Sequence, residues 1–178
     1  MHIRKREDTN MRRETKTLIR CLLISVCLLS ITAGASYGEG YKALDGLTSV
    51  KAVFDFRAGN PKGAAMQLDM IYRIAHDKNI MAVTEKPEFA IVFIGPSVKL
   101  ISKNRVGFSP EELESLDEIA GTVSRMSKEG VRLEICLVAA KVMGVDPSSI
   151  LPEIVGVENG WISLIGYQAK GYSIVPAY

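Results

Sequence analysis

One cysteine lies where the sequence pattern changes from that of a strand to that of a helix. Residues 131–135 alternate apolar and polar side chains, which predicts a strand, and residues 137–143 predict a short helix ending at Gly144. Cys136 is therefore expected at a helix N-terminus, where unpaired N–H groups and the helix dipole favour the thiolate over the thiol. The competing interpretation is an inert, buried cysteine, because an isolated cysteine most often packs as a small apolar residue.

The segment around this cysteine, GVRLEICLVAAKVMGVD over residues 130–146, resembles the cysteine segment of the DsrE/DsrF-like family. In that family a Gly-Val-x-Leu-x-x-Cys strand leads into an Ala-rich helical turn and a Gly-Val pair. The resemblance implies that Cys136 carries a persulfide in a sulfur relay, as a sulfurtransferase-like carrier. Arg132 and Lys141 are candidates for positive charge beside the thiol if their side chains turn inward.

The first 35 residues have the pattern of a signal peptide. A basic segment, residues 1–20, precedes an apolar run over residues 21–33, and Ala33-Gly34-Ala35 supplies the small-x-small cleavage pattern. We expect cleavage near Ala35, with Met1 or Met11 as the start, and a periplasmic or secreted product. The apolar run is shorter than the roughly 20 residues that span a bilayer, so no stable membrane anchor is expected after cleavage.

Removal of this segment leaves one cysteine, Cys136, and one histidine, His76. A single cysteine cannot form an internal disulfide, and one cysteine with one histidine supplies too few soft ligands for a zinc site. We therefore expect no metal and no other cofactor. The remaining chain is slightly acidic, which gives no indication of nucleic-acid binding.

A second group of candidate site residues lies around the end of the first expected strand, residues 50–57. Asn60 is expected to cap a helix that runs to about residue 77. The glycines of this turn match neither GxGxxG nor GxxxxGK[ST], so an ordinary strand-to-helix turn is preferred over a phosphate cradle. Asp55, Arg57 and Asn60 are kept as candidate substrate-binding residues.

The segment FAIVFIGPSVKLI, residues 89–101, predicts a strand, a turn and a short helix over residues 98–101. Its continuous apolar run indicates a strand buried on both faces. This segment also resembles the DsrE/DsrF-like family, in which many relatives carry a histidine just before the glycine of the turn. Ile94 occupies that position here, and its side chain cannot take over a proton-transfer role assigned to that histidine. Gly95 is kept as a candidate substrate-binding residue.

The remaining signals complete one α/β domain over residues 50–178. A capping box begins at Ser109, and after the cysteine segment a strand, a helix capped by Asn159 and a last strand are expected. Strands that alternate with helices predict a five-stranded, mostly parallel sheet with helices on both faces, of the flavodoxin-like or doubly wound type. Residues 36–49 are expected to form a mobile leader or an added edge strand.

The resemblance to the family covers about residues 50–178 and implies partners. Relatives assemble as trimers or hexamers, and aromatic side chains near the C-terminus are candidates either for such an interface or for core packing: Trp161, Tyr167, Tyr172 and Tyr178. A carrier would exchange sulfur with donor and acceptor proteins or with polysulfide. Two functions are open: a periplasmic single-cysteine persulfide carrier in sulfur trafficking or oxidation, and an exported oligomeric ligand-binding or structural module with an inert cysteine.

Overall fold

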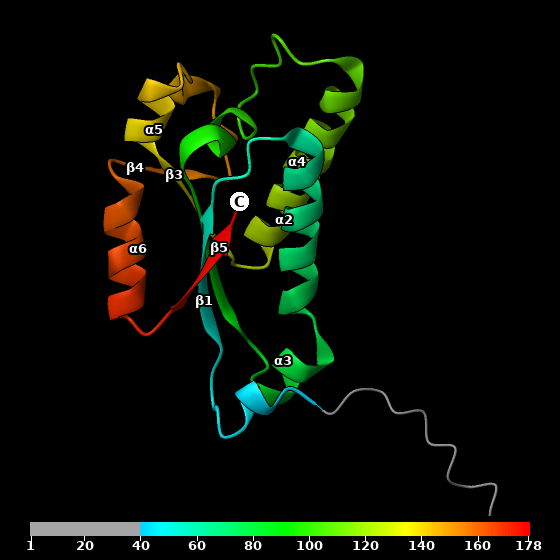
Figure 1. Ribbon diagram of the computed structural model, residues 1–178, viewed down its shortest axis with the longest axis vertical. Helices are drawn as coiled ribbons and strands as arrows, with labels where there is room; N and C mark the ends of the chain where they lie inside the picture. The colour runs from blue at the N-terminus through cyan, green and yellow to red at the C-terminus, as the bar shows by residue number, and fades with distance from the viewer. Residues whose placement is uncertain (1–39) are drawn as a thin grey trace, which may run out of the picture. The chain divides into compact units, whose positions relative to one another are not determined.

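The computed structural model describes residues 40–178, of which residues 41–178 form one compact unit. The expected signal peptide and the first part of the expected leader lie outside the described residues. Helices and strands alternate along the described chain (Figure 1). In chain order the elements are η1 (Lys42–Leu44), β1 (Lys51–Phe56), α2 (Pro61–Ala75), α3 (Lys78–Val83), β2 (Glu88–Phe93), η2 (Gly95–Lys99), α4 (Pro110–Lys128), β3 (Arg132–Cys136), α5 (Leu137–Val142), η3 (Pro147–Ser149), β4 (Val155–Val157), α6 (Gly160–Ala169) and β5 (Ser173–Ala177).

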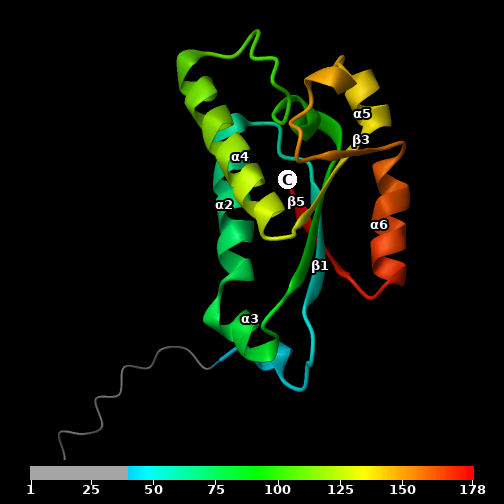
Figure 2. The same cartoon turned by 180° about the vertical axis from the view of Figure 1, so that it is seen from behind.

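The five strands form one sheet in the order β4-β3-β2-β1-β5, and all neighbouring strands are parallel. The helices α2 and α4 cover one face and α6 covers the other, in both views (Figures 1 and 2). This arrangement confirms the predicted α/β fold. From β1 to β4 the chain moves in one direction across the sheet, and α6 then returns it to the other side of β1. The direction of winding therefore reverses between β1 and β5, and such a reversal marks the usual ligand-binding edge.

The two edge strands of the sheet are short or interrupted. β5 contains Pro176, which pairs in register with Asp55 of β1. β4, at the other edge, is three residues long. Residues 42–44 form a 3-10 turn, so the described part of the leader adds no strand to the sheet. The expectation of an edge strand is therefore wrong for residues 40–49.

The two faces of the sheet carry side chains of different size. The face toward α2 and α4 carries large apolar side chains: Phe54, Phe56, Phe89, Ile91 and Phe93. Two aromatic pairs between β1 and β2 on this face meet edge to face, with ring centroids 5.5 and 5.3 Å apart. The face toward α6 carries smaller apolar side chains: Val53, Ala90, Val92, Ile94 and Cys136. Shorter side chains on this face let α6 approach the sheet closely.

The helix starts confirm the caps that the sequence predicts. Asn60 Oδ1 accepts a hydrogen bond from a first-turn backbone N–H at 2.9 Å, and Asn159 Oδ1 accepts one from Trp161 N at 3.0 Å. Ser109 and Glu112 form both bonds of the capping box. Each cap fixes the residue at which its helix begins, and with it the length of the preceding loop.

Two helical segments differ from the sequence-based expectation. α2 ends at Ala75, because the Asp77 side chain caps a separate helix, α3, by accepting from Asn79 N at 2.8 Å. The short helix expected over residues 98–101 begins earlier, at Gly95, and is the 3-10 helix η2. Within residues 40–178, no helix combines the length and the apolar character that crossing a membrane requires.

Candidate functional site

Arg57, Ile94 and Cys136 form a row across the carboxyl ends of β1, β2 and β3. Phe56, Phe93 and Ile135 are register partners, and these three residues come directly after them. Ile94 N also donates to Phe56 O at 2.9 Å. Because side chains alternate along a strand, all three point to the α6 face of the sheet. Neighbouring strands lie about 4.8 Å apart, so the Cα atoms of Arg57 and Cys136 are about 10 Å apart.

Cys136 is the last residue of β3 and the N-cap of α5, as the sequence predicts. Its Sγ accepts a hydrogen bond from Ala139 N at 3.4 Å. The residue is 4% exposed, and it is the free cysteine of the described chain. The thiol is thus placed at a helix N-terminus but covered in this conformation.

The first turn of α6 forms this cover. A Cβ atom built on Gly160 would lie 2.9 Å from Ile94 Cδ1 and 3.0 Å from Cys136 Cβ. Real Cβ atoms do not approach neighbours this closely, so only glycine lets α6 begin here without a shift of the sheet residues. Cys136 therefore lies at the starts of two helices, as the N-cap of α5 and against the first residue of α6.

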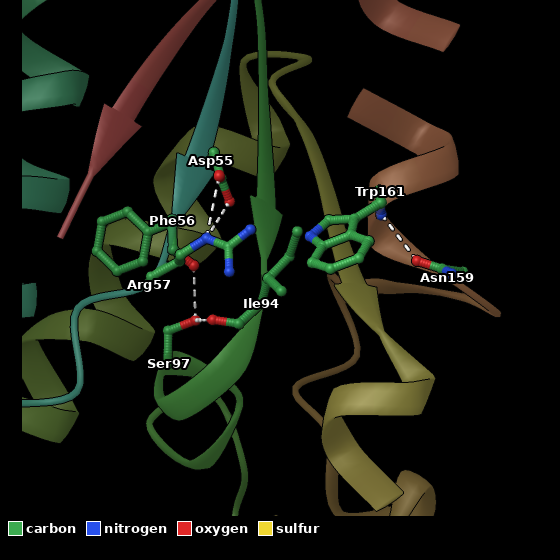
Figure 3. A network of polar contacts seen from close by, with 7 residues as sticks. All are labelled: Asp55, Phe56, Arg57, Ile94, Ser97, Asn159 and Trp161. Atoms are coloured by element: carbon green, nitrogen blue, oxygen red, sulfur yellow. Dashed lines mark hydrogen bonds and ion pairs between the residues drawn. The ribbon is translucent and has the colours of Figure 1, made fainter. Parts of the chain in front are cut away.

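A buried ion pair lies at the other end of the row. Asp55 is 7% exposed, and its two carboxylate oxygens accept from Arg57 Nε at 2.9 and 3.0 Å. This pairing compensates the cost of burying a carboxylate. In Figure 3 the Arg57 guanidinium and the Trp161 indole turn toward each other, with the Ile94 side chain between them. The structure thus brings the predicted residues Asp55 and Arg57 together, and it adds Trp161, which the sequence analysis did not place at the site.

The turns after β1 and β2 are held together by a serine that the sequence analysis missed. Ser97 is fully buried, and its Oγ contacts Phe56 O at 2.8 Å and Ile94 O at 3.1 Å (Figure 3). The turn it stabilises begins at Gly95, whose φ of 66° favours glycine. Gly95 therefore shapes the carboxyl edge through its backbone. A small polar residue directly after a Gly-Pro pair was the available signal for Ser97.

The other predicted site residues do not reach the thiol. Asn60 uses its side chain to cap α2. Arg132 is at the opposite end of β3, four residues before Cys136, which is about 13 Å along a strand. Lys141 is exposed in the last turn of α5. Neither positive charge that the sequence analysis placed beside Cys136 lies there.

Two tyrosines that were candidates for a subunit interface or for the core pack between α6 and the sheet. Tyr167 OH donates to Glu134 Oε1 at 2.6 Å, and Tyr172 OH donates to Glu88 Oε2 at 2.8 Å. Glu88 also pairs with Lys51 at 2.7 Å. Tyr167 and Tyr172 are 6% and 5% exposed, so core packing, the second of the two alternatives, applies to both. The sequence pattern could not show that strand carboxylates would satisfy these hydroxyl groups.

Burial and the neighbouring carboxylates change the ionisation of these groups. Desolvation, and then the hydrogen bond to Glu134, raise the pKa of Tyr167 above its ordinary value. Desolvation, and then Glu88, raise the pKa of Tyr172. The hydrogen bonds from Lys51 and then from Tyr172 lower the pKa of Glu88. The folded state therefore favours neutral tyrosines and an ionised Glu88.

Alkaline pH should destabilise the fold through Tyr167. Its raised pKa means that its stabilising effect is complete below about pH 10, where tyrosine ionises in the unfolded chain, and is lost as pH rises further. We expect the urea midpoint to fall as pH rises above about 10, the tyrosine pKa of the unfolded chain, and to fall less steeply in Tyr167→Phe. Tyr178→Phe, at a site 72% exposed, is the control and should keep the parent slope. Equal slopes for the parent and Tyr167→Phe would contradict the assignment.

Within residues 40–178, no group of three or more His, Cys, Asp or Glu side chains is placed to hold a metal ion. The reactive and polar side chains at this carboxyl edge include the Cys136 thiol and the Arg57 guanidinium, with the Trp161 indole beside them.

Known proteins resemble this chain in sequence and in fold. An uncharacterized protein of Aquifex aeolicus (strain VF5) is 24% identical over 128 residues, a match that covers 71% of this chain and 56% of that protein. The chain thus spans little more than half the length of this relative. The structure of MTH1491 from Methanobacterium thermoautotrophicum, a protein of unknown function, covers 72% of this chain and 99% of its own, with a TM-score of 0.55 and 16% identity. The ychN protein from E. coli has the same coverage, with a TM-score of 0.49 and 8% identity.

The similarity to MTH1491 shows a shared fold. The model of the DsrE/DsrF-like family matches residues 51–176, a range that begins with β1, ends within β5 and includes Cys136. The chain belongs to the DsrE/DsrF-like family.

Proposed function

We propose that the mature protein is an exported sulfur carrier in which Cys136 holds a persulfide. One observation carries the proposal: the only free thiol of the described chain caps α5 at the carboxyl end of β3, beneath the first turn of α6. At the start of α5, Ala139 N donates to the Cys136 sulfur, and the same backbone group is placed to donate to a persulfide there. Family membership and the expected signal peptide support a relay outside the cytoplasm.

Loading from polysulfide balances without a further reactant. The Cys136 thiolate attacks a sulfane sulfur, a new S–S bond forms, and the donor S–S bond breaks with its electron pair leaving on the shortened polysulfide. The thiol proton goes to solvent. The product, the persulfide anion Cys–S–S⁻, has no second thiol within the described chain to attack it, so it cannot discharge into an internal disulfide. Such a persulfide is suited to transfer onto the thiol of an acceptor protein.

The burial of Cys136 sets a condition on this function. At 4% exposure the thiol has no room for a second sulfur, so Gly160 and Ile94 have to move apart when sulfur is loaded. The same burial favours the second candidate, an exported ligand-binding or structural module in which the cysteine is inert. Access to the thiol in the folded protein separates the two functions.

Intact mass of the protein before and after polysulfide treatment tests the carrier function. A persulfide adds about 32 Da, dithiothreitol removes it, and peptide mapping should locate it on Cys136. The untreated mass also reports the N-terminus, where cleavage after Ala35 is expected in an exporting host. No mass gain, with alkylation only after unfolding in urea, would leave the inert-cysteine module. If the protein still carried residues 1–35 after expression in an exporting host, the proposed localisation would be contradicted.

We also propose that copies of the chain associate through the outer face of α6. Ile162 and Ile165 are 67% and 66% exposed, while Leu164 of the same helix is buried against the sheet. A helix that is apolar on both faces is normally covered on both. Val138 and Val142 are exposed on α5, a helix that lies on the same side of the sheet as α6 in both views (Figures 1 and 2). Together these four side chains form an apolar surface suited to a homo-oligomer, with the trimer or hexamer of relatives as the expected size.

Sedimentation of the purified protein should show this association. The parent should sediment as one closed oligomer, and Ile162→Glu should shift it to the monomer, because a carboxylate cannot be buried in an apolar contact without a partner. Met66→Glu is the matched control, since Met66 is 63% exposed on α2, on the other side of the sheet. A parent that stays monomeric at every concentration would contradict the proposed interface.

A further inference from the structure

An arginine occupies the edge of the sheet where its winding reverses. Arg57 directly follows β1, and its backbone N–H donates to Ala177 O of β5 at 2.7 Å. β1 and β5 are the two strands between which the winding changes direction. Open α/β sheets bind their ligands outside the carboxyl ends of strands at this point. Arg57 is thus the cationic side chain at the expected ligand edge.

The side chain of Arg57 is held in place but keeps most of its donors free. Both oxygens of the buried Asp55 accept from its Nε, which fixes the plane of the guanidinium. Within residues 40–178, its two terminal nitrogens have no hydrogen-bond partner, and the side chain is 30% exposed. Paired N–H groups in one plane match two oxygens of a sulfonate, sulfate or carboxylate group.

A second donor faces the same point. The Trp161 indole turns its nitrogen-bearing edge toward the Arg57 guanidinium, with Ile94 between them (Figure 3). Its N–H has no acceptor in the described part of the chain, whereas its backbone N–H is held by Asn159. Two sets of unused donors therefore converge above an apolar side chain that adjoins Cys136. This arrangement is suited to a ligand with an oxyanion end and a soft, poorly hydrated end.

We propose that Arg57 and Trp161 bind the oxyanion end of the sulfur donor, and that the donor belongs to the thiosulfonate class, with thiosulfate as its simplest member. This inference rests on the proposed carrier function. The sulfonate oxygens bind the two donor groups, and the sulfane sulfur lies against Ile94, on the side of Cys136. Polysulfide lacks oxygen atoms and would gain little from a planar guanidinium.

The transfer step balances in atoms and electrons. When the Ile94 side chain turns away from Gly160, the Cys136 thiolate attacks the sulfane sulfur of thiosulfate while Arg57 and Trp161 hold the sulfonate. A Cys–S–S bond forms, the S–S bond of thiosulfate breaks, and sulfite leaves with the electron pair. The thiol proton goes to solvent, and no external oxidant or reductant takes part. Arg57 stabilises the negative charge that remains on the departing sulfite.

Binding can be measured without transfer in the mature Cys136→Ser protein. Trp161 is the only tryptophan of the chain, so its fluorescence reports directly on the proposed site. At constant ionic strength, we expect thiosulfate to change the Trp161 fluorescence in a saturable way and sulfate to compete with it. Chloride should neither change the fluorescence nor compete. Arg57→Lys should weaken binding about tenfold, because an ammonium cannot reproduce the planar pair of donors. Arg73→Lys, which alters an exposed arginine of α2 paired with Asp69, is the matched control and should bind like its parent.

Trp161→Phe, followed by calorimetry, tests the second donor. Phe keeps the ring but lacks the N–H, and the site is 60% exposed, so the fold should be retained while affinity falls several-fold, on the order of one neutral hydrogen bond. No saturable binding, or equal affinity in Arg57→Lys and its parent, would overturn the inference. Polysulfide loading without thiosulfate binding would refute this subsite alone. Thiosulfate binding without sulfur loading at Cys136 would support the subsite and refute the carrier function.

Discussion

The Cys136→Ser variant should gain no sulfur from any donor and should keep the parent fold. A serine hydroxyl is not ionised at neutral pH and has no adjacent base among the described contacts of this residue, so it cannot attack a sulfane sulfur. Serine is among the preferred N-cap residues, and its Oγ can replace Sγ as the acceptor for Ala139 N. The substitution therefore removes the nucleophile while retaining the cap of α5.

Intact mass and urea unfolding on the same preparation separate these two roles. The serine variant should not gain the mass of one sulfur atom, about 32 Da. Its urea midpoint should be close to that of the parent. Cys136→Ala is the matched control: it is equally unable to load sulfur, but it loses the cap at a cost of about 0.5–2 kcal/mol. A serine variant that still gains dithiothreitol-sensitive mass would show that sulfur is bound elsewhere in the chain.

Gly160→Ala should lower the free energy of unfolding by about 1–3 kcal/mol, the usual cost of an added methyl group in a packed site. The new Cβ would lie within 3.0 Å of both Ile94 and Cys136. Ile94 Cδ1 is the end of a flexible side chain and can turn aside, but Cys136 Cβ is fixed by its strand. The first turn of α6 therefore has to move away from the thiol, which should also speed the alkylation of Cys136.

A glycine in the same helix provides the control. A Cβ on Gly166 would meet no atom within 4 Å, so Gly166→Ala should stabilise α6 by up to about 1 kcal/mol through helix propensity. Ile94→Val removes Cδ1 and should cost about 0.5–1.5 kcal/mol alone, but less in the Gly160→Ala background. Equal effects of alanine at the two glycines would contradict the close approach of α6 to Cys136.

Local signals in the sequence were sufficient for the strand-to-helix junctions. Asn60, Ser109 and Asn159 cap the helices that they were expected to cap, because capping depends on residues within one turn of each other. The position of Cys136 was also predicted correctly, because apolar and polar residues alternate up to it and helical spacing of apolar residues begins directly after it. The parallel sheet also followed from the order of the elements, as helical crossovers between strands require it.

The composition of the site could not be derived in this way. Arg57 and Trp161 face each other because α6 runs from β4 to β5 across the face of the sheet to which Arg57 points. This crossing depends on the order of the strands, which the periodicity of the sequence does not encode. In the sequence, Gly160 has no feature beyond following the N-cap Asn159. The need for glycine there follows only from the close packing of α6 on Ile94 and Cys136. The sequence left Tyr167 between an interface and the core, because aromatic content does not show which face of a helix is buried.

The two edges of the sheet limit how copies of this protein can meet. Proline has no N–H to offer to a neighbouring strand, and β5 carries Pro176 near its carboxyl end. At the opposite edge, three residues of β4 give too short a template for stable pairing with a foreign strand. Both edges therefore offer little backbone for pairing with a strand of another molecule, which disfavours growth of the sheet from one molecule into the next and amyloid-like stacking.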